Sequence, residues 1–263
     1  MQDNVWGAAN LVRGTYAGEF GGTYEELLGV SKVVGTLGQV AGRITWKWPR
    51  GTTEVKSYPG MIMGNKPGYA SSWTQPGGYN VILPDGSISQ TFPSGKTPNS
   101  WFPMQIPFAA QIQMAASYQH NITPTGQGHF SYDIWLQSMP TQTVGWNSQG
   151  EITHEIMIPL SSWGNYGVYP TGRNPAWYVT DATIDGRLYH MYRALQFGGG
   201  WQFIVFQPDK PIPSGTVLNF TSMLTYLRSM GWVQSQWLVS IELGVEPVYG
   251  VGDITLYDYR IWK

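Results

Sequence analysis

Alternating side chains in residues 131–136 and 155–160 constrain the fold of this chain more than any other feature. Side chains along a β-strand point to opposite faces in turn. Asp133 lies on one face of the first stretch, and Glu155 lies on one face of the second. The same faces carry Trp135 and Met157, whereas the opposite faces carry only apolar or aromatic residues: Tyr132, Ile134, Leu136, Ile156, Ile158 and Leu160. The pattern predicts two strands that pack a core on one side and present a carboxylate on the other.

A third stretch with the same alternation lies nearer the C-terminal end, at residues 241–247. One face carries Glu242, Gly244 and Glu246, and the other carries Ile241, Leu243 and Val245. Three strands of this kind favour a sheet with an apolar inner face. Its outer face would form a cleft that bears carboxylates.

Most of the remaining chain has the pattern of short strands separated by turn residues. The expected strands cover residues 11–16, 38–48, 54–58, 111–118, 129–136, 151–160, 176–180, 188–195, 201–207, 237–245 and 253–262. Residues 64–98 are rich in Gly, Pro, Asn and Ser, and we expect them to form loops that wall the cleft. The pattern predicts an all-β fold with a single domain over residues 1–263. Its architecture would be a β-jelly roll sandwich of two antiparallel sheets with an open concave cleft.

One segment has helical spacing instead. Its apolar residues recur at i, i+3, i+4 and i+7: Phe220, Met223, Leu224 and Leu227. Asn219 suits the N-cap position, and Gly231 suits the position just after the last turn. The sequence therefore predicts one short helix over residues 220–230.

Composition excludes several classes of protein. A net charge of −1 with only 12% charged residues fits neither a disordered chain nor a basic surface for nucleic acid or anionic lipid. No apolar run approaches the roughly 20 residues of a membrane helix, and residues 1–6 do not resemble a signal peptide. Without cysteine there are no disulfides or thiolate metal sites. The scattered histidines show no metal-ligand spacing, and His154 has the parity of a core residue.

Aromatic residues are more numerous than a core of this size requires. The chain has 13 Trp, 16 Tyr and 9 Phe. Most of them are expected to pack in the core. An uncharged surface rich in aromatic and polar groups also suits stacking on the apolar faces of sugar rings.

Two glutamates on neighbouring strands of one face suit the hydrolysis of a glycosidic bond. Retaining hydrolysis uses one carboxylate as nucleophile and a second carboxyl as acid, about 5–5.5 Å apart. Exposed strand faces often carry glutamates, however, so the alternation alone also fits solvated surface residues.

At these residues the chain resembles glycoside hydrolase family 12, which comprises small β-jelly-roll endoglucanases and xyloglucanases. The resemblance lies in several short segments in matching order: residues 4–7, 46–51, 55–59, 131–136, 155–158 and 241–247. It covers nearly the whole chain, although residues 64–98 and 141–150 align poorly.

The resemblance implies a role for each matching residue. Glu155 would be the nucleophile, and Glu246 would be the general acid and then the base that activates water. Asp133 would orient Glu155. Substrate contacts would come from five further residues: Asn4, Trp6, Met157, Trp135 and Glu242. Trp6 is also consistent with a tryptophan that only pins the first strand to its sheet.

Two positions depart from the family pattern, and one further residue has two open interpretations. Pro159 stands where the family usually has tryptophan, and its missing N–H suits a strand edge, end or bulge. We expect it to end ladder pairing near the cleft and to widen the cleft there. Val245 stands where threonine or phenylalanine is more frequent. Glu242 could raise the proton affinity of the acid by its charge, or it could be a hydrogen-bonded spacer below the groove.

The sequence therefore predicts a retaining endo-β-1,4-glucanase that acts on cellulose-like, mixed-linkage or xyloglucan chains. The alternative is a non-catalytic carbohydrate-binding module. We expect no cofactor and no metal, because carboxyls and water carry out both steps. The expected partner is a β-glucan, with no nucleic acid and no membrane, and the expected form is a monomer. A polymeric substrate also implies a secreted enzyme.

Overall fold

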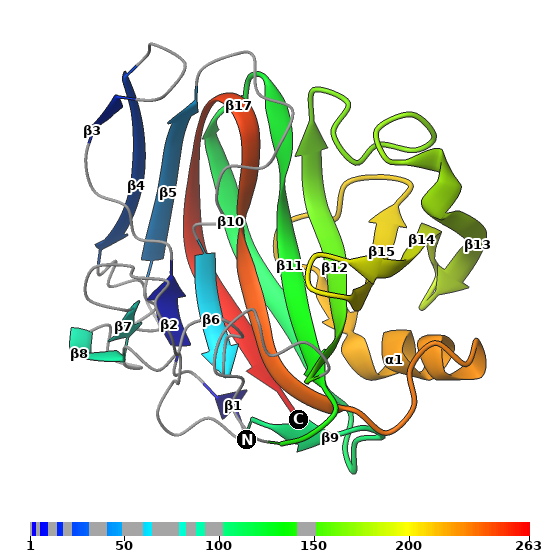
Figure 1. Ribbon diagram of the computed structural model, residues 1–263. Helices are drawn as coiled ribbons and strands as arrows, with labels where there is room; N and C mark the ends of the chain where they lie inside the picture. The colour runs from blue at the N-terminus through cyan, green and yellow to red at the C-terminus, as the bar shows by residue number, and fades with distance from the viewer. Residues whose placement is uncertain are drawn as a thin grey trace.

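The computed structural model describes residues 102–140 and 151–263 and, before them, the strands β1 to β8 (Figure 1). Those strands are β1 (Gln2–Asp3), β2 (Trp6–Ala9), β3 (Thr15–Ala17), β4 (Thr23–Ser31), β5 (Ala41–Trp48), β6 (Gly60–Gly64), β7 (Tyr79–Ile82) and β8 (Ile88–Phe92). The later strands are β9 (Met104–Gln105), β10 (Gln113–Ile122), β11 (Gln127–Gln137), β12 (Ile152–Trp163), β13 (Tyr178–Ile184), β14 (Arg187–Phe197), β15 (Trp201–Pro208), β16 (Val217–Asn219) and β17 (Trp237–Trp262). The helical segments are η1 (Pro175–Trp177) and α1 (Phe220–Ser229).

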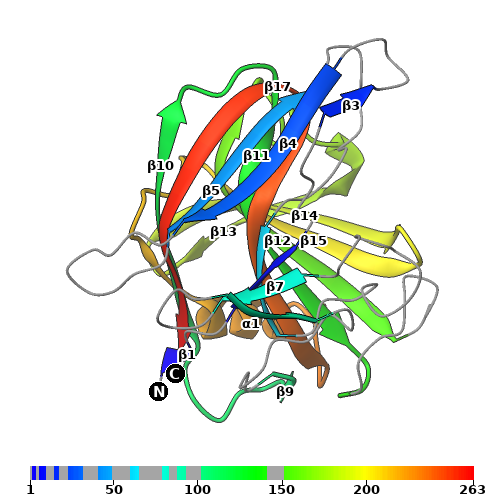
Figure 2. The same ribbon diagram turned by 90° about the vertical axis from the view of Figure 1, so that its left-hand side faces the viewer.

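Two curled layers of strands make up the fold (Figure 2). In the front sheet the hydrogen-bonded order is β13–β14–β15–β12–β11–β17–β6–β2–β7–β8. In the back sheet the order is β4–β5–β17–β10–β16, and β1 pairs with the end of β17. The expected two-sheet sandwich with one short helix is thus confirmed. One pairing is not antiparallel, because β12 and β15 run parallel.

Strand β17 belongs to both layers. Up to Tyr249 it pairs with β11 in the front sheet, and from Gly250 it pairs with β5 in the back sheet. Gly250 has φ +109°, and a Cβ atom there would lie 2.0 Å from the carbonyl oxygen of Thr125. Only glycine fits such a backbone. The sequence predicts two strands here, and that expectation is wrong because the chain changes sheets without a turn.

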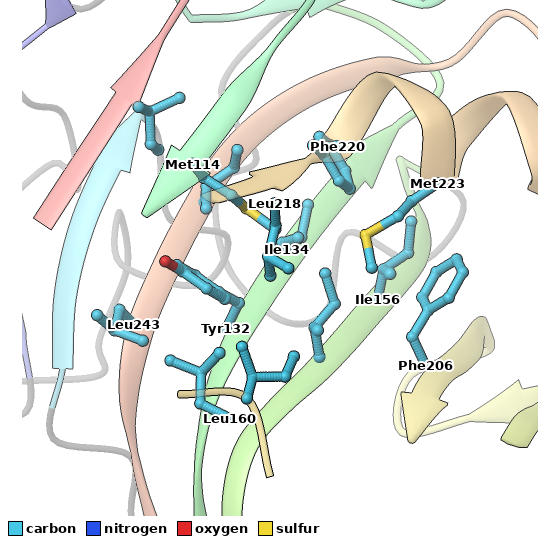
Figure 3. Packing of buried hydrophobic residues seen from close by; sticks show 14 of the residues in the cluster. Met114, Tyr132, Ile134, Ile156, Leu160, Phe206, Leu218, Phe220, Met223 and Leu243 are labelled. Atoms are coloured by element: carbon cyan, nitrogen blue, oxygen red, sulfur yellow. The ribbon is translucent and has the colours of Figure 1, made fainter. Parts of the chain in front are cut away.

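The core lies between the two sheets, under α1. The apolar faces of β11, β12 and β17 supply Phe130, Tyr132, Ile134, Leu136, Ile156, Ile158, Leu160, Ile241, Leu243 and Val245. Figure 3 shows Phe220 and Met223 of α1 in the same cluster as Ile134 and Ile156 of the front sheet. Burying each such side chain contributes about 1.5–3 kcal/mol. The predicted parity of all three strands is therefore confirmed, and it orients their other face away from the core.

Helix α1 forms where its spacing predicts it. The four apolar residues named above are all buried. The Asn219 side chain accepts a hydrogen bond from the Ser222 N–H at 3.2 Å, and Gly231 follows the last turn with φ +67°. Both end signals are therefore confirmed. Of the helices that the structure describes, none combines the length and hydropathy that a membrane span needs.

Several expectations for the first hundred residues differ from the structure. Residues 64–98 contain β7 and β8, so this stretch is not only loop. The expected strand at 11–16 appears as β3, at residues 15–17. Strands β4 and β6 have no counterpart among the predictions. The expected strand at residues 54–58 and the segment 141–150 lie outside the described residues.

His154 is a buried histidine that should make stability depend on pH. It is 2% exposed, and its Nε2–H donates to the carbonyl oxygen of Trp232 at 2.9 Å. Burial lowers its pKa to about 4; the Trp232 hydrogen bond opposes this, and the Arg193 charge adds to it. Because the unfolded pKa is about 6.5, the stabilisation is present above pH 6.5. It is lost as pH falls towards 4.

We expect this titration to remove about 3 kcal/mol from the free energy of unfolding between pH 6.5 and pH 4. Urea denaturation at several pH values measures the loss. His154→Gln keeps a donor for the Trp232 carbonyl but cannot titrate, so its stability should depend less on pH over this window. An identical pH dependence in the variant would exclude His154 as the cause.

Candidate active site

Strand β11 lies between the two strands that carry the predicted catalytic glutamates. On one side Trp135 pairs with Glu155 of β12, and on the other side His129 pairs with Glu246 of β17. Both glutamates have the parity opposite to the core residues of their strands. They therefore lie on the same outer face of the front sheet, as the sequence predicts. We call this face the carboxylate face; it carries Asp133, Glu155, Glu242 and Glu246.

Tyr166 has a phenol whose pKa both glutamates affect. It is half-buried in the loop after β12. Burial raises the pKa of its phenol, and the negative charges of Glu246 and Glu155 raise it further, whereas Arg173 lowers it. A single hydroxyl is thus within electrostatic reach of both carboxylates. Their partners on β11, Trp135 and His129, lie six residues apart along that strand.

Glu155 is held by a tryptophan that the sequence analysis did not assign to the site. Its carboxylate Oε2 accepts a hydrogen bond from the Trp201 indole N–H at 2.7 Å. Glu155 is 7% exposed and Trp201 is 8% exposed, so the bond is shielded from water. A donor to the ionised form favours that form. This environment suits a carboxylate that must attack as an anion.

Asp133 and Met157 are neighbours on adjacent strands next to Glu155. Asp133 pairs with Met157 of β12, so it is a diagonal neighbour of Glu155 on the same face. Its Oδ2 accepts a hydrogen bond from the Trp135 indole N–H at 3.1 Å. Asp133 is 4% exposed, and Trp135 and Met157 are each 2% exposed. Trp135 also packs against Trp201 in an edge-to-face contact. The indole N–H groups of the two tryptophans therefore fix two carboxylates: Trp135 holds Asp133, and Trp201 holds Glu155.

Glu246 is held by a histidine. His129 Nε2 lies 2.6 Å from Glu246 Oε2, and the His129 side chain is completely buried while that of Glu246 is 15% exposed. Burial lowers the pKa of His129; the charge and hydrogen bond of Glu246 oppose this, and Arg173 adds to it. Glu155 and Glu246 thus have different surroundings, an indole N–H at the first and an imidazole at the second.

Residues 164–174 cover this end of the site. The Tyr166 ring meets the His129 ring edge-on, with centroids 5.0 Å apart. The Arg173 Nε–H donates to Gln207 Oε1 at 3.2 Å. Burial lowers the pKa of Arg173, while nearby Tyr166 and Glu246 oppose that shift, so the guanidinium lies near Glu246. Nothing in the sequence pattern of this loop indicates the site.

The remaining predicted substrate contacts can be placed only in part. Asn4 lies outside the described residues. Trp6 begins β2, where its backbone pairs with Ile82, and its side chain lies outside the described residues. Val245 is completely buried on the core face, so it does not point to the carboxylate face.

Pro159 forms a bulge on one side of its strand. Pairing between β11 and β12 shifts register at Pro159 and then continues to Trp163. The expectation that ladder pairing ends at Pro159 is therefore wrong on the β11 side, where Pro159 lies at a bulge, one of the positions expected for it. On the other side of β12, pairing with β15 stops at Met157.

Glu242 lies beside Asp133 in the register and is completely buried. The Ser240 hydroxyl lies 3.4 Å from its Oε1. If Glu246 is the acid, we expect Glu242→Gln to shift the alkaline limb of the pH–rate profile to lower pH, because it removes a buried negative charge from the face that carries Glu246. Measuring kcat/KM from pH 4 to 9 checks this. An unmoved limb would leave Glu242 as a hydrogen-bonded spacer.

Known proteins share the sequence pattern of this chain. The sequence profile of glycosyl hydrolase family 12 matches residues 69–261. Endoglucanase S of Pectobacterium parmentieri is 25% identical over 222 residues, which are 82% of this chain and 69% of that protein. Xyloglucan-specific endo-beta-1,4-glucanase 1 of Phytophthora nicotianae is 29% identical over 197 residues, 72% of this chain and 70% of that protein.

Solved structures share the fold. The native family 12 xyloglucanase from Bacillus licheniformis superimposes with a TM-score of 0.64 at 22% identity, covering 98% of this chain and 90% of that chain. Both glutamates lie within the residues that the family profile matches. The chain therefore belongs to glycosyl hydrolase family 12 and is a glycoside hydrolase.

Proposed function

We propose that this enzyme is a retaining endo-β-1,4-glucanase that cleaves internal bonds of β-glucan chains by double displacement. Glu155 attacks the anomeric carbon while Glu246 protonates the departing glycosidic oxygen. Glu246 then removes a proton from water, whose oxygen displaces Glu155 from the sugar. The observation that carries the proposal is that both carboxylates lie on one face of the front sheet, on the two strands that flank β11.

The two environments support this assignment of roles. A buried N–H donor on Glu155 favours its anionic form, as a nucleophile requires. Glu246 is the more exposed of the two, lies next to residues 164–174 and has a second oxygen that accepts no hydrogen bond from the described residues. That oxygen is available to a glycosidic oxygen and to water. Asp133 would orient Glu155 from the neighbouring strand.

Relatives support a glucan as the substrate. The names of the similar proteins refer to endoglucanase and to xyloglucan-specific activity. We propose that cellulose-like chains, mixed-linkage glucan and xyloglucan are the candidates to compare.

Because such polymers do not enter cells, we also propose that the enzyme acts outside the cell. Fractionation of a producing culture would test this, and activity confined to the cells would contradict it.

Reducing-sugar release from carboxymethylcellulose, barley β-glucan and xyloglucan tests the activity. Endo-cleavage should lower the viscosity of the solution long before much reducing sugar appears. Proton NMR of the first product distinguishes the mechanisms, because a retaining enzyme releases the β-anomer first. An α-anomer at the earliest time would contradict double displacement. Glycan binding without any turnover would leave a carbohydrate-binding protein instead.

A further inference from the structure

His129 contacts the proposed acid but has no role in the reaction so far. Its Nε2 lies 2.6 Å from Glu246 Oε2, a short hydrogen bond between fully and largely buried groups. The other ring nitrogen, Nδ1, is buried and has no hydrogen-bond partner among the described residues. The imidazole is therefore directed at a single atom of the site.

The missing partner of Nδ1 indicates where the ring proton lies. A neutral imidazole carries one N–H and one bare nitrogen. A buried N–H without an acceptor leaves a strong donor unsatisfied, so the proton belongs on Nε2, where Glu246 Oε2 accepts it. Burial and the positive charge of Arg173 both disfavour the doubly protonated ring. His129 is thus a neutral donor to one oxygen of the acid.

Two neighbouring residues restrict this pair, one by packing and one by charge. Tyr166 packs edge-on against the imidazole and limits its rotation. Arg173, tied to Gln207, contributes positive charge near Glu246. Oε2 of Glu246 is consequently occupied by an N–H, and Oε1 accepts no hydrogen bond from the described residues.

We propose that His129 is a positioning residue that selects which oxygen of Glu246 carries the catalytic proton. Its N–H occupies Oε2, so the proton of the acid lies on Oε1. That proton moves to the glycosidic oxygen as the bond from this oxygen to the anomeric carbon breaks and the bond to Glu155 forms. In the second step Oε1 takes a proton from water. The proton on His129 is not transferred.

This inference rests on the proposed function. The two can be tested separately, because only a substrate with a poor leaving group needs an acid. Cleavage of a glucan requires protonation of a poor leaving group, whereas 2,4-dinitrophenolate leaves without a proton. We expect His129→Phe to lower kcat/KM on barley β-glucan by about 100-fold, within the range of general acid catalysis. On 2,4-dinitrophenyl β-cellobioside the loss should stay within about threefold.

A matched variant tests the hydrogen bond itself. His129→Gln can place an amide N–H near the former Nε2 and should recover most of the glucan activity. His129→Met lacks a donor and provides the same contrast if the phenylalanine variant does not fold, as judged by circular dichroism and thermal melting. Equal losses on both substrates, or no loss on glucan, would overturn the proposal. A wild-type enzyme without activity on glucan would instead overturn the proposed function.

Discussion

Glu155→Gln should lower turnover of β-glucan by about 10⁴-fold or more, the order expected when a covalent nucleophile is lost. The amide is close to the carboxylate in shape and can still accept the Trp201 N–H, but it cannot form the glycosyl ester. Binding of the glycan should persist, because the sheet and its aromatic residues do not change. Reducing-sugar release measures turnover, and isothermal titration with a cello-oligosaccharide measures binding.

Two measurements show whether this loss is specific. A 2-deoxy-2-fluoro cellobioside with a good leaving group should label the wild-type enzyme, and mass spectrometry should locate the label on Glu155. Trp201→Phe keeps the nucleophile but removes its N–H donor, so its loss should be smaller, about 10- to 100-fold. Turnover that survives Glu155→Gln, or a label on another residue, would remove Glu155 from the mechanism.

Glu246→Ala should lower glucan turnover by about 10²- to 10⁴-fold, because it removes both the acid and the base. The two steps can be separated with 2,4-dinitrophenyl β-cellobioside, whose leaving group needs no acid. On this substrate the first step should continue and the glycosyl-enzyme should accumulate. Azide needs no base to attack, so it should restore turnover and yield a β-glycosyl azide.

Glu151→Gln is a matched control for the second prediction. Glu151 is a partly exposed turn residue just before β12, so its substitution should leave turnover within about twofold of the wild type, as for most surface changes. If azide failed to restore turnover in Glu246→Ala while the variant remained folded, Glu246 would not be the acid/base residue.

The strands at the centre of the site could be predicted from the sequence because their burial is one-sided. Residues of β11 and β12 alternate between core and carboxylate face, and this alternation is local, so it appears in the chain itself. Helix α1 was predictable for the same reason, with cap residues at both ends. The two glutamates followed from the alternation together with the family resemblance.

The rest depends on pairings between distant segments. Trp201 looks like an ordinary core tryptophan, and only the parallel pairing of β15 with β12 brings it to Glu155. Residues 164–174 carry no motif, yet they place Tyr166 and Arg173 near Glu246. His129 could have been placed on the carboxylate face from the sequence, because it has the same parity as Asp133 on its strand. Metal-ligand spacing among the histidines does not indicate this position.

The path of β17 has a consequence for how the enzyme loses activity on heating. One uninterrupted strand carries Glu246 in one layer and, past Gly250, pairs with β5 in the other. Glu246 therefore lies within a strand and not in a loop that could move independently. Displacing it requires both layers to separate, so inactivation should coincide with cooperative melting of the whole sandwich and not precede it.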